Sequence, residues 1–256
     1  MKRVLTGLIL APLITYAVLA GPLWMFLAVL WAIAFLCFWE FRGIVAAHGL
    51  EAPGPAAFVA GLAILAAPAE FVLPVLFALL FLSLALRGND LAKYLPSAGA
   101  LILGLFYVFG SWRMASELRG RNPYWLFFAL ALNWVGDTAA YYTGRAMGRH
   151  KLAPGISPGK TLEGSAASIL ASVVFGIVFA RFLLPGVTGW EAAVVAAAGN
   201  LAGQLGDLAE SAMKRGAGLK DSGNLLPGHG GWLDRVDSSL FSVPTVFVIV
   251  TRLGLH

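Results

Sequence analysis

Long apolar segments, separated by short polar ones, constrain this fold more than any other feature of the sequence. A membrane-spanning helix needs about 20 mostly apolar residues, and fewer where neighbouring helices shield its ends. By that rule we expect an all-α, polytopic integral membrane protein with about nine transmembrane helices, or eight, because the third and fifth segments are short. The candidate spans are residues 4–20, 22–41, 56–69, 70–86, 97–112, 124–144, 165–184, 190–211 and 239–254.

The charge content supports a membrane protein and argues against a nucleic-acid partner. Only 12% of the 256 residues are charged, whereas about 25% is usual in soluble domains. The net charge is +5, but the basic residues are scattered between apolar segments and do not form one basic face. They suit loops beside anionic lipid. The single cysteine, Cys37, excludes an internal disulfide, and its apolar neighbours predict a buried side chain.

The placement of Lys and Arg predicts the orientation in the membrane, because these residues favour the cytoplasmic side. With nine spans and the N-terminus inside, thirteen of the eighteen basic residues are cytoplasmic. The polar loops 145–164 and 212–238 then lie on the same side. We therefore expect a multi-pass protein of the cell (inner) membrane, with its active site in a polar cavity at the cytoplasmic side. The basic cluster of Arg113, Arg119 and Arg121 falls outside and fits this topology badly.

The distribution of small residues predicts how the chain is organised. Residues 1–123 are rich in Leu, Phe and Trp, whereas later spans carry many Ala, Gly and Ser, which let helices pack closely. We expect one membrane domain over 1–256, with 1–123 mainly scaffold and 124–256 the catalytic half. Small-residue faces are also compatible with a homodimer. Residues 1–21 imitate a cleavable signal, but a second apolar span follows at once, so we expect a retained helix.

A polar stripe runs along the segment 190–211. Asn200, Gln204, Asp207 and Ser211 are spaced so that they share one helix face. Polar groups in a membrane need partners, so the stripe lines either a cavity or a helix–helix seam. For Asn200 and Gln204 a hydrogen-bond ladder between helices is an alternative to function. Asp207 is the stronger functional candidate, because a buried carboxylate needs a cation or a proton.

A similar face occurs at the end of the segment 124–144, where Asn133, Asp137, Tyr141 and Gly144 recur at helical spacing. The basic residues that follow could serve as a surface anchor. The next segment, 156–164, supplies a proline-fixed turn, a hydroxyl group and Lys160. Thr161 and Glu163 also suit the start of a helix. The Gly-Lys-Thr triplet is not a Walker loop, because the first glycine is misplaced and no strand is expected before it.

Residues 207–237 hold the densest cluster of charges. Its acids offer the hard oxygen ligands that Mg²⁺ prefers, and its bases offer phosphate-binding donors. Its glycines let backbone N–H groups approach an anion. A loop held at lipid headgroups is the alternative. Together these groups predict phosphoryl or nucleotidyl transfer at the membrane face. For His229, phosphate contact, proton transfer and a role in the turn all remain open.

This cluster resembles the signature of the phosphatidate cytidylyltransferase (CDP-diacylglycerol synthase) family. The matching residues are Ser211–Arg215, Lys220–Gly223, His229–Gly231, Asp234–Arg235 and Asp237. Two upstream segments, Gly136–Tyr141 and Ser157–Gly164, also look like motifs of that family. The departures are Gly159, where a second lysine is expected, and Trp232, where an aliphatic residue is usual.

The resemblance implies a membrane enzyme that converts CTP and phosphatidate to CDP-diacylglycerol and pyrophosphate. It implies Mg²⁺ as cofactor, with a monovalent cation such as K⁺ at a second site. We expect a catalytic set of Asp207, Ser211, Asp234, Lys214 and Arg235. We expect a substrate-binding set of Lys160, Thr161, Arg215, Lys220, Asp221, His229 and Asp137, and metal ligation by Asp207, Asp234 and Asp237. The rival interpretations are a transferase with another lipid phosphate acceptor and a cation-coupled transporter that relays ions through Asp137 and Asp207.

Overall fold

A computed structural model describes residues 2–66, 91–226, 228 and 230–255, and the side chains from residue 11 onward except that of Leu91. The described chain is mostly helical, as expected. The span expected at 70–86 lies outside the described residues. The helices are α1 Lys2–Leu19, α2 Leu23–Ala47, α3 Pro55–Ala66, α5 Leu91–Gly104, the π-helix η1 Leu105–Gly110, α6 Ser111–Arg121, α7 Pro123–Met147, α8 Leu162–Leu183, α9 Gly189–Gly216, α10 Leu233–Val236 and α11 Ser239–Leu253.

Four helical segments of the described chain are long and apolar enough to cross a membrane. They are Leu23–Ala47, Ala92–Arg121, Leu162–Leu183 and Leu233–Leu253, and Pro55–Ala66 is a shorter apolar helix. An all-α membrane protein is consistent with these segments, and the number nine remains a prediction. Cys37 is fully buried, as expected.

The arginine cluster that fitted our topology badly lies at the end of the long helical segment Ala92–Arg121. The run continues through η1 into α6, so Arg113, Arg119 and Arg121 lie on a helix instead of a loop. Arg119 donates hydrogen bonds to the carbonyl oxygens of Val18 at 3.0 Å and Gly21 at 2.5 Å. Val18 lies in the last turn of α1 and Gly21 just after the helix, where backbone acceptors lack partners within the helix. The cluster therefore includes a structural arginine.

Contacts divide the chain into two compact units, each built from three segments. One comprises Met1–Ile9, Leu23–Arg113 and Met213–Arg235, and the other comprises Leu10–Pro22, Met114–Ala212 and Val236–His256. The expected single membrane domain, with scaffold and catalytic halves that meet at residue 123, stays a prediction.

In the first unit, α2, α3 and η1 pack around aromatic side chains. The rings of Phe38 and Phe109 lie 5.0 Å apart between centroids, and both residues are fully buried. The ring of Phe109 occupies the space that a Cβ on Gly61 would fill, and Phe41 does the same at Gly104. Glycine is needed at these two positions so that the helices can close over the rings.

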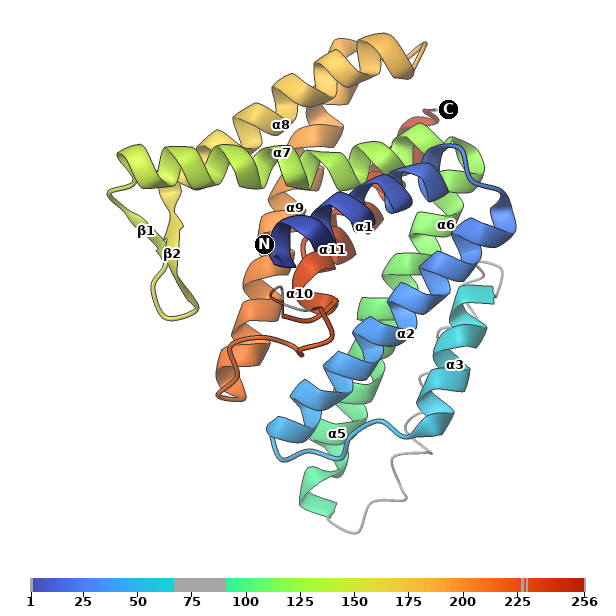
Figure 1. Cartoon of the computed structure of the whole chain (residues 1–256), viewed down its shortest axis with the longest axis vertical. Helices are drawn as coiled ribbons and strands as arrows, with labels where there is room; N and C mark the ends of the chain where they lie inside the picture. Colours follow the sequence, from blue (N-terminus) through green and yellow to red (C-terminus); the bar gives the residue numbers. More distant parts are fainter. Residues whose placement is uncertain (1, 67–90, 227, 229, 256) are drawn as a thin grey trace. The chain divides into compact units, whose positions relative to one another are not determined.

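In the second unit, α7 and α8 lie side by side, and a hairpin connects them (Figure 1). Its strands, β1 Lys151–Ala153 and β2 Ser157–Thr161, pair antiparallel. We expected a proline-fixed turn here and no strand, so the hairpin is a departure from all-α within the described residues. Pro158 cannot extend a helix because it lacks an N–H group, and the chain pairs with itself instead.

The starts of α7 and α8 follow the rules of helix capping. The side chain of Asn122 accepts a hydrogen bond from the Tyr124 N–H at 3.0 Å, and Pro123 occupies the first helical position. The Thr161 hydroxyl accepts one from the Gly164 N–H at 3.1 Å. This confirms that Thr161 starts a helix, and it fixes where β2 ends and α8 begins.

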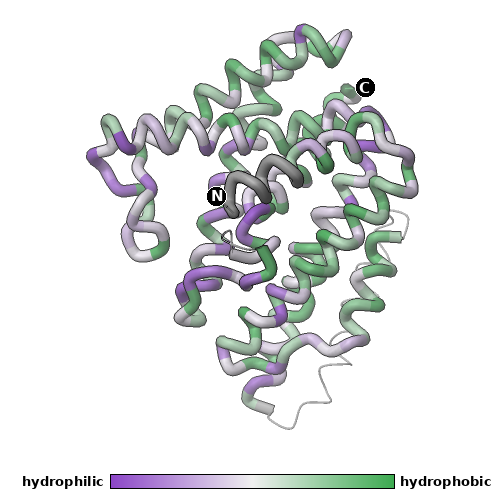
Figure 2. Tube along the Cα trace, in the orientation of Figure 1, coloured by the Kyte–Doolittle hydropathy of each residue, from purple (hydrophilic) through white to green (hydrophobic). Residues whose placement is uncertain are grey.

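Hydrophilic residues are concentrated in a few places. Figure 2 shows them along the loop that follows α9 and at the junction of α7 with β1, whereas α2 and α8 are mostly hydrophobic. These polar segments are the two that the sequence analysis selected, and each lies within its own unit.

Candidate active site

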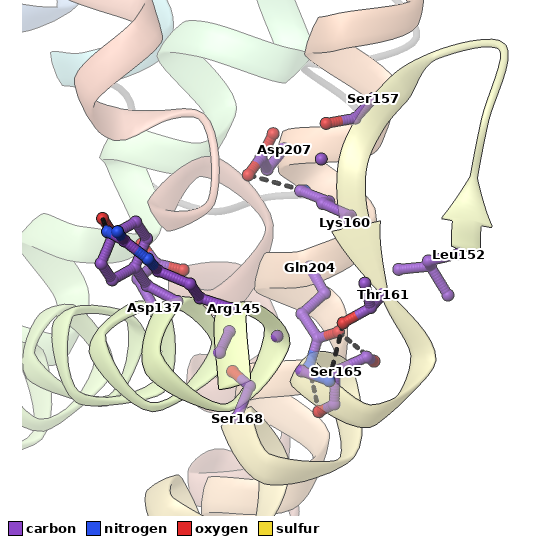
Figure 3. Close-up of a pocket in the computed structure, with 15 residues that line it drawn as sticks. Asp137, Arg145, Leu152, Ser157, Lys160, Thr161, Ser165, Ser168, Gln204 and Asp207 are labelled. Atoms are coloured by element: carbon purple, nitrogen blue, oxygen red, sulfur yellow. Dashed lines mark hydrogen bonds and ion pairs between the residues drawn. The ribbon is translucent and has the colours of Figure 1, made fainter. Parts of the chain in front are cut away.

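A cavity of about 470 Å³ opens in the second unit between α7, the hairpin, α8 and α9. Figure 3 shows polar side chains from all four elements around it. The lining residues are Asp137, Ala140, Tyr141, Gly144, Arg145, Leu152, Ser157, Gly159, Lys160, Thr161, Gly164, Ser165, Ser168, Gln204 and Asp207. The polar face of α7, the segment 156–164 and the polar stripe of α9 therefore all contribute to one cavity.

An ion pair joins the hairpin to α9 inside this cavity. Lys160 Nζ lies 2.7 Å from Asp207 Oδ2, and the two side chains are 27% and 30% exposed. Ser211, one turn further along α9, donates its hydroxyl proton to Asp207 Oδ1 at 3.3 Å. Three predicted site residues are thus brought together. Since the pair is partly exposed, a phosphate that enters the cavity can reach the lysine.

Helix α7 lines the cavity with a second set of charges. Asp137, Tyr141 and Arg145 recur at intervals of four residues and all line the cavity. Arg145 Nη1 donates a hydrogen bond to the Tyr141 hydroxyl at 3.1 Å. The cavity therefore combines two carboxylates with two cations, which is the charge pattern that a phosphate–metal complex requires.

The deeper polar residues form a ladder between α8 and α9. Asn200 Nδ2 donates to Ser168 Oγ at 3.0 Å, and Gln204 Nε2 donates to Asn200 Oδ1 at 2.7 Å. Ser165 donates its hydroxyl proton to Gln204 Oε1. The alternative reading of Asn200 and Gln204, a hydrogen-bond ladder between helices, is confirmed. The ladder holds the helix that carries Asp207.

Glu163 fastens the base of the hairpin. Its carboxylate accepts hydrogen bonds from His150 Nδ1 at 2.7 Å and from the His150 N–H at 3.2 Å. His150 immediately precedes β1, and Glu163 lies in the first turn of α8. This contact and the Thr161 cap set where β2, and with it Lys160, can lie.

A separate charged cluster lies in the first unit, at the end of α9. Lys214 Nζ lies 2.5 Å from Asp234 Oδ1, and the side chains are only 9% and 6% exposed. Asp234 also accepts hydrogen bonds from the backbone N–H groups of Ser222 at 3.0 Å and Gly231 at 2.7 Å. The loop after α9 thus folds back so that Asp234 reaches Lys214.

Glu40 on α2 contacts the same loop, and our sequence reasoning missed it. Its carboxylate accepts hydrogen bonds from the Ser222 hydroxyl at 3.0 Å, the Trp232 N–H at 3.0 Å and the Leu233 N–H at 2.8 Å. The available signal was a carboxylate within an apolar span, where ionisable residues are costly and usually functional.

The model of the cytidylyltransferase family matches residues 1–253. This chain belongs to the cytidylyltransferase family.

Its relatives include proteins named phosphatidate cytidylyltransferase from three staphylococci. Identity is 38% over 164 residues with that of Staphylococcus saprophyticus and 40% over 163 residues with that of Staphylococcus epidermidis. Each alignment covers 64% of this chain and 60% of the relative. Identity is 37% over 155 residues with that of Staphylococcus aureus strain COL, covering 60% of both chains. The chain thus spans about 60% of the length of the curated relatives it matches.

The remaining predicted site residues are mostly exposed. Arg215, Lys220, Asp221 and Arg235 are exposed, and Arg215 donates to the Leu219 carbonyl at 2.9 Å. Asp237 Oδ1 accepts a hydrogen bond from the Ser238 N–H at 2.6 Å, just before α11. The prediction for His229 lies outside the described residues.

The carboxylates of the predicted site differ in how they could meet a metal ion. Within the described residues, no three His, Cys, Asp or Glu side chains gather as a ready metal site. Mg²⁺, however, often binds through one or two carboxylates plus substrate phosphates and water. Asp137 and Asp207, which line one cavity, fit that mode. Asp234 already accepts hydrogen bonds on both oxygens, and metal ligation by Asp234 and Asp237 stays a prediction.

Proposed function

We propose that this protein is a phosphatidate cytidylyltransferase, which transfers CMP from CTP to phosphatidate and yields CDP-diacylglycerol and pyrophosphate for phospholipid synthesis. Three findings support this: the family membership, the names of the relatives and the apolar helices. The observation that carries the proposal is the Lys160–Asp207 pair in a cavity that also holds Asp137 and Arg145. That set combines phosphate-binding cations with oxygen ligands for a metal.

In the reaction, a phosphatidate oxygen attacks the α-phosphorus of CTP. A new P–O bond forms to the lipid phosphate while the bond from the α-phosphorus to the β-phosphate bridge oxygen breaks, and pyrophosphate leaves with that electron pair. No covalent enzyme intermediate is needed, because the lipid phosphate is already an anionic nucleophile. The chain's task is to hold two anions in line and to offset their repulsion.

Lys160 and Arg145 are the groups of the cavity that offset this charge. Before substrate binds, Asp207 holds the Lys160 ammonium at 2.7 Å within the cavity. A triphosphate carries more charge than one carboxylate, so it competes for the lysine when it enters. Lys160 then neutralises charge on the departing pyrophosphate.

Asp137 and Asp207 would hold Mg²⁺, which when bound neutralises phosphate oxygens and screens the two substrates from each other. Release of Asp207 from Lys160 would leave its oxygens available to the cation. A monovalent cation such as K⁺ at a second site is part of the same proposal, on the strength of the family resemblance.

The proposal includes the membrane setting. We infer a multi-pass protein of the cell (inner) membrane with about nine helices and with the cavity facing the cytoplasm, where CTP is available. Phosphatidate would reach the cavity from the surrounding lipid. A homodimer is compatible with the small-residue helix faces.

The test is a reconstituted assay with the purified protein in mixed micelles of detergent and phosphatidate. With CTP and Mg²⁺ we expect CDP-diacylglycerol and pyrophosphate in equal amounts, and none without phosphatidate. Lysophosphatidate and a polyprenyl phosphate, tested as acceptors in parallel, distinguish a related transferase. If no acceptor yields pyrophosphate, the transferase proposal is wrong and a transporter becomes the better interpretation.

A further inference from the structure

Glu40 is a carboxylate that is 3% exposed and lies within the apolar span Leu23–Ala47. Burying such a group is costly unless hydrogen-bond donors surround it. Three donors surround Glu40, all from the segment between the end of α9 and the start of α10. They are the Ser222 hydroxyl and the N–H groups of Trp232 and Leu233. The apolar helix therefore offers the loop a fixed anionic attachment point.

The loop backbone wraps closely around this carboxylate. A Cβ on Gly223 would lie 2.7 Å from Glu40 Oε1, and a Cβ on Gly231 would collide with Glu40 Oε2 and with the Ser222 hydroxyl. Real side chains essentially never approach so closely. Glycine at both positions is what allows the loop to close on Glu40.

The same loop residues also hold Asp234. Ser222 donates its hydroxyl proton to Glu40 and its backbone N–H to Asp234. Gly231 donates its N–H to Asp234, and the next two N–H groups go to Glu40. The loop therefore lies between two carboxylates, and the position of Asp234 depends on the attachment to Glu40.

The residue that follows α2, His48, contacts the other end of this segment. His48 Nε2 lies 2.9 Å from the Met213 carbonyl oxygen, and because a carbonyl only accepts, the nitrogen is the donor. Gly216 packs against the same ring, where a Cβ would lie 2.8 Å from Cε1. Lys214 thus lies next to the contact with His48, and Asp234 next to the attachment to Glu40.

We propose that Glu40 is a positioning residue of the transferase, which fixes Ser222, Trp232 and Leu233 so that Asp234 meets Lys214 at the end of α9. The effect on turnover rests on the proposed function, whereas the attachment of the loop does not. Helix α2, expected only as scaffold, thereby serves the reaction without touching substrate.

The hydrogen bonds require an acceptor oxygen on both sides of the Glu40 carboxyl group. Oε1 faces the Trp232 N–H and Oε2 faces the Leu233 N–H. In Glu40→Gln the amide NH₂ must face one of these donors, whichever way it is turned, so one buried N–H loses its acceptor. Ser222→Ala is gentler, because it removes one hydroxyl donor and keeps both backbone N–H groups attached.

Amide hydrogen exchange on the full-length protein in micelles, read by peptide mass spectrometry, tests the attachment directly. In Glu40→Gln we expect exchange in peptides covering 222–234 to accelerate by about 10- to 100-fold, the scale set by losing a hydrogen bond to a charged acceptor. Peptides of α7 and α8 should not change. Ser222→Ala should show a smaller acceleration confined to the same peptides. Glu51→Gln, the same change at an exposed position, is the control and should leave exchange and activity unchanged.

Activity is measured on the same samples. We expect kcat/KM for CTP to stay at the wild-type value in Glu51→Gln, to fall in Ser222→Ala and to fall furthest in Glu40→Gln. The losses should follow the increases in exchange rate. Unchanged loop exchange in Glu40→Gln overturns the proposal, and so does accelerated exchange with full activity. If Glu40→Gln does not fold, Ser222→Ala decides by the same two readouts. If the wild-type protein makes no CDP-lipid, the proposed function fails, and the exchange data alone still judge the attachment.

Discussion

Lys160 on the hairpin and Asp207 on α9 form an ion pair of 2.7 Å inside a polar cavity. The pair joins two segments that the sequence analysis selected for different reasons, one for its lysine after a turn and one for its polar stripe. Because each side chain is about one-third exposed, the pair itself contributes little to stability. We propose that the two groups act instead on phosphates that enter the cavity.

Neutralising either member of this pair should abolish most of the transferase activity without unfolding the protein. We expect Lys160→Met and Asp207→Asn to lower kcat/KM by about 100-fold or more, the scale of a lost transition-state contact to charge. Lys151→Met, at an exposed position on the other strand of the same hairpin, is the control and should retain activity. Full activity in Lys160→Met would show that the cavity is not where CTP phosphates bind.

The metal requirement should depend on Asp137 as well as on Asp207. Chelation with EDTA should stop product formation, and added Mg²⁺ should restore it. In Asp137→Asn we expect the Mg²⁺ midpoint, measured at fixed CTP, to rise by about 10-fold, because one hard oxygen ligand becomes a neutral amide. Lys151→Met serves as comparison, since it changes neither Asp137 nor the Lys160–Asp207 pair and should keep the wild-type midpoint. An unchanged midpoint in Asp137→Asn would exclude this residue from the metal site.

Helical periodicity predicted the polar face of α9 because it acts over short distances, and two residues of that face, Gln204 and Asp207, line the cavity. Once this segment forms a helix, the spacing of Asn200, Gln204 and Asp207 places them on one face, independently of how the other helices pack. What it could not predict was the partner of each group. Only the packing of α8 against α9 decides that Asn200 joins a ladder with Ser168, while Asp207 meets Lys160.

The features that the sequence did not reveal either depend on contacts between distant segments or leave too weak a local pattern. Glu40 is remote in sequence from Ser222, and no local pattern links them. The hairpin was missed because strands of three and five residues are too short to show an alternating pattern. Arg119 was placed in a loop because the π-helix that joins α5 to α6 cannot be recognised from hydropathy.

Close packing of α7 against α8 and α9 should make Gly136 intolerant of any side chain. A Cβ there would collide with Asn200 and lie 2.5 Å from the Ser168 hydroxyl. We expect Gly136→Ala to cost about 1–3 kcal/mol, as overpacking usually does, and to lower the Tm measured in detergent. Gly99→Ala is the matched control, because open space surrounds that position on α5. It should raise the Tm slightly, since alanine restricts the unfolded chain. Equal effects at both sites would contradict the packing described for α7.

The buried pair of Lys214 and Asp234 should show a characteristic pattern of single and double substitutions. Removing Lys214 alone leaves a carboxylate that is 6% exposed without its cation, which usually costs about 3–5 kcal/mol. We therefore expect Lys214→Met to lower the Tm more than the double variant Lys214→Met/Asp234→Asn, in which that charge is also gone.

Neither variant should turn over CTP, because both groups belong to the expected catalytic set. Thermal unfolding in detergent and the CDP-lipid assay, run on the same preparations, separate the two effects. The matched control is Lys220→Met, which removes an exposed lysine of the same segment and should leave the Tm unchanged. If the double variant is less stable than Lys214→Met, the two side chains act independently, and the pair does not hold the loop to α9.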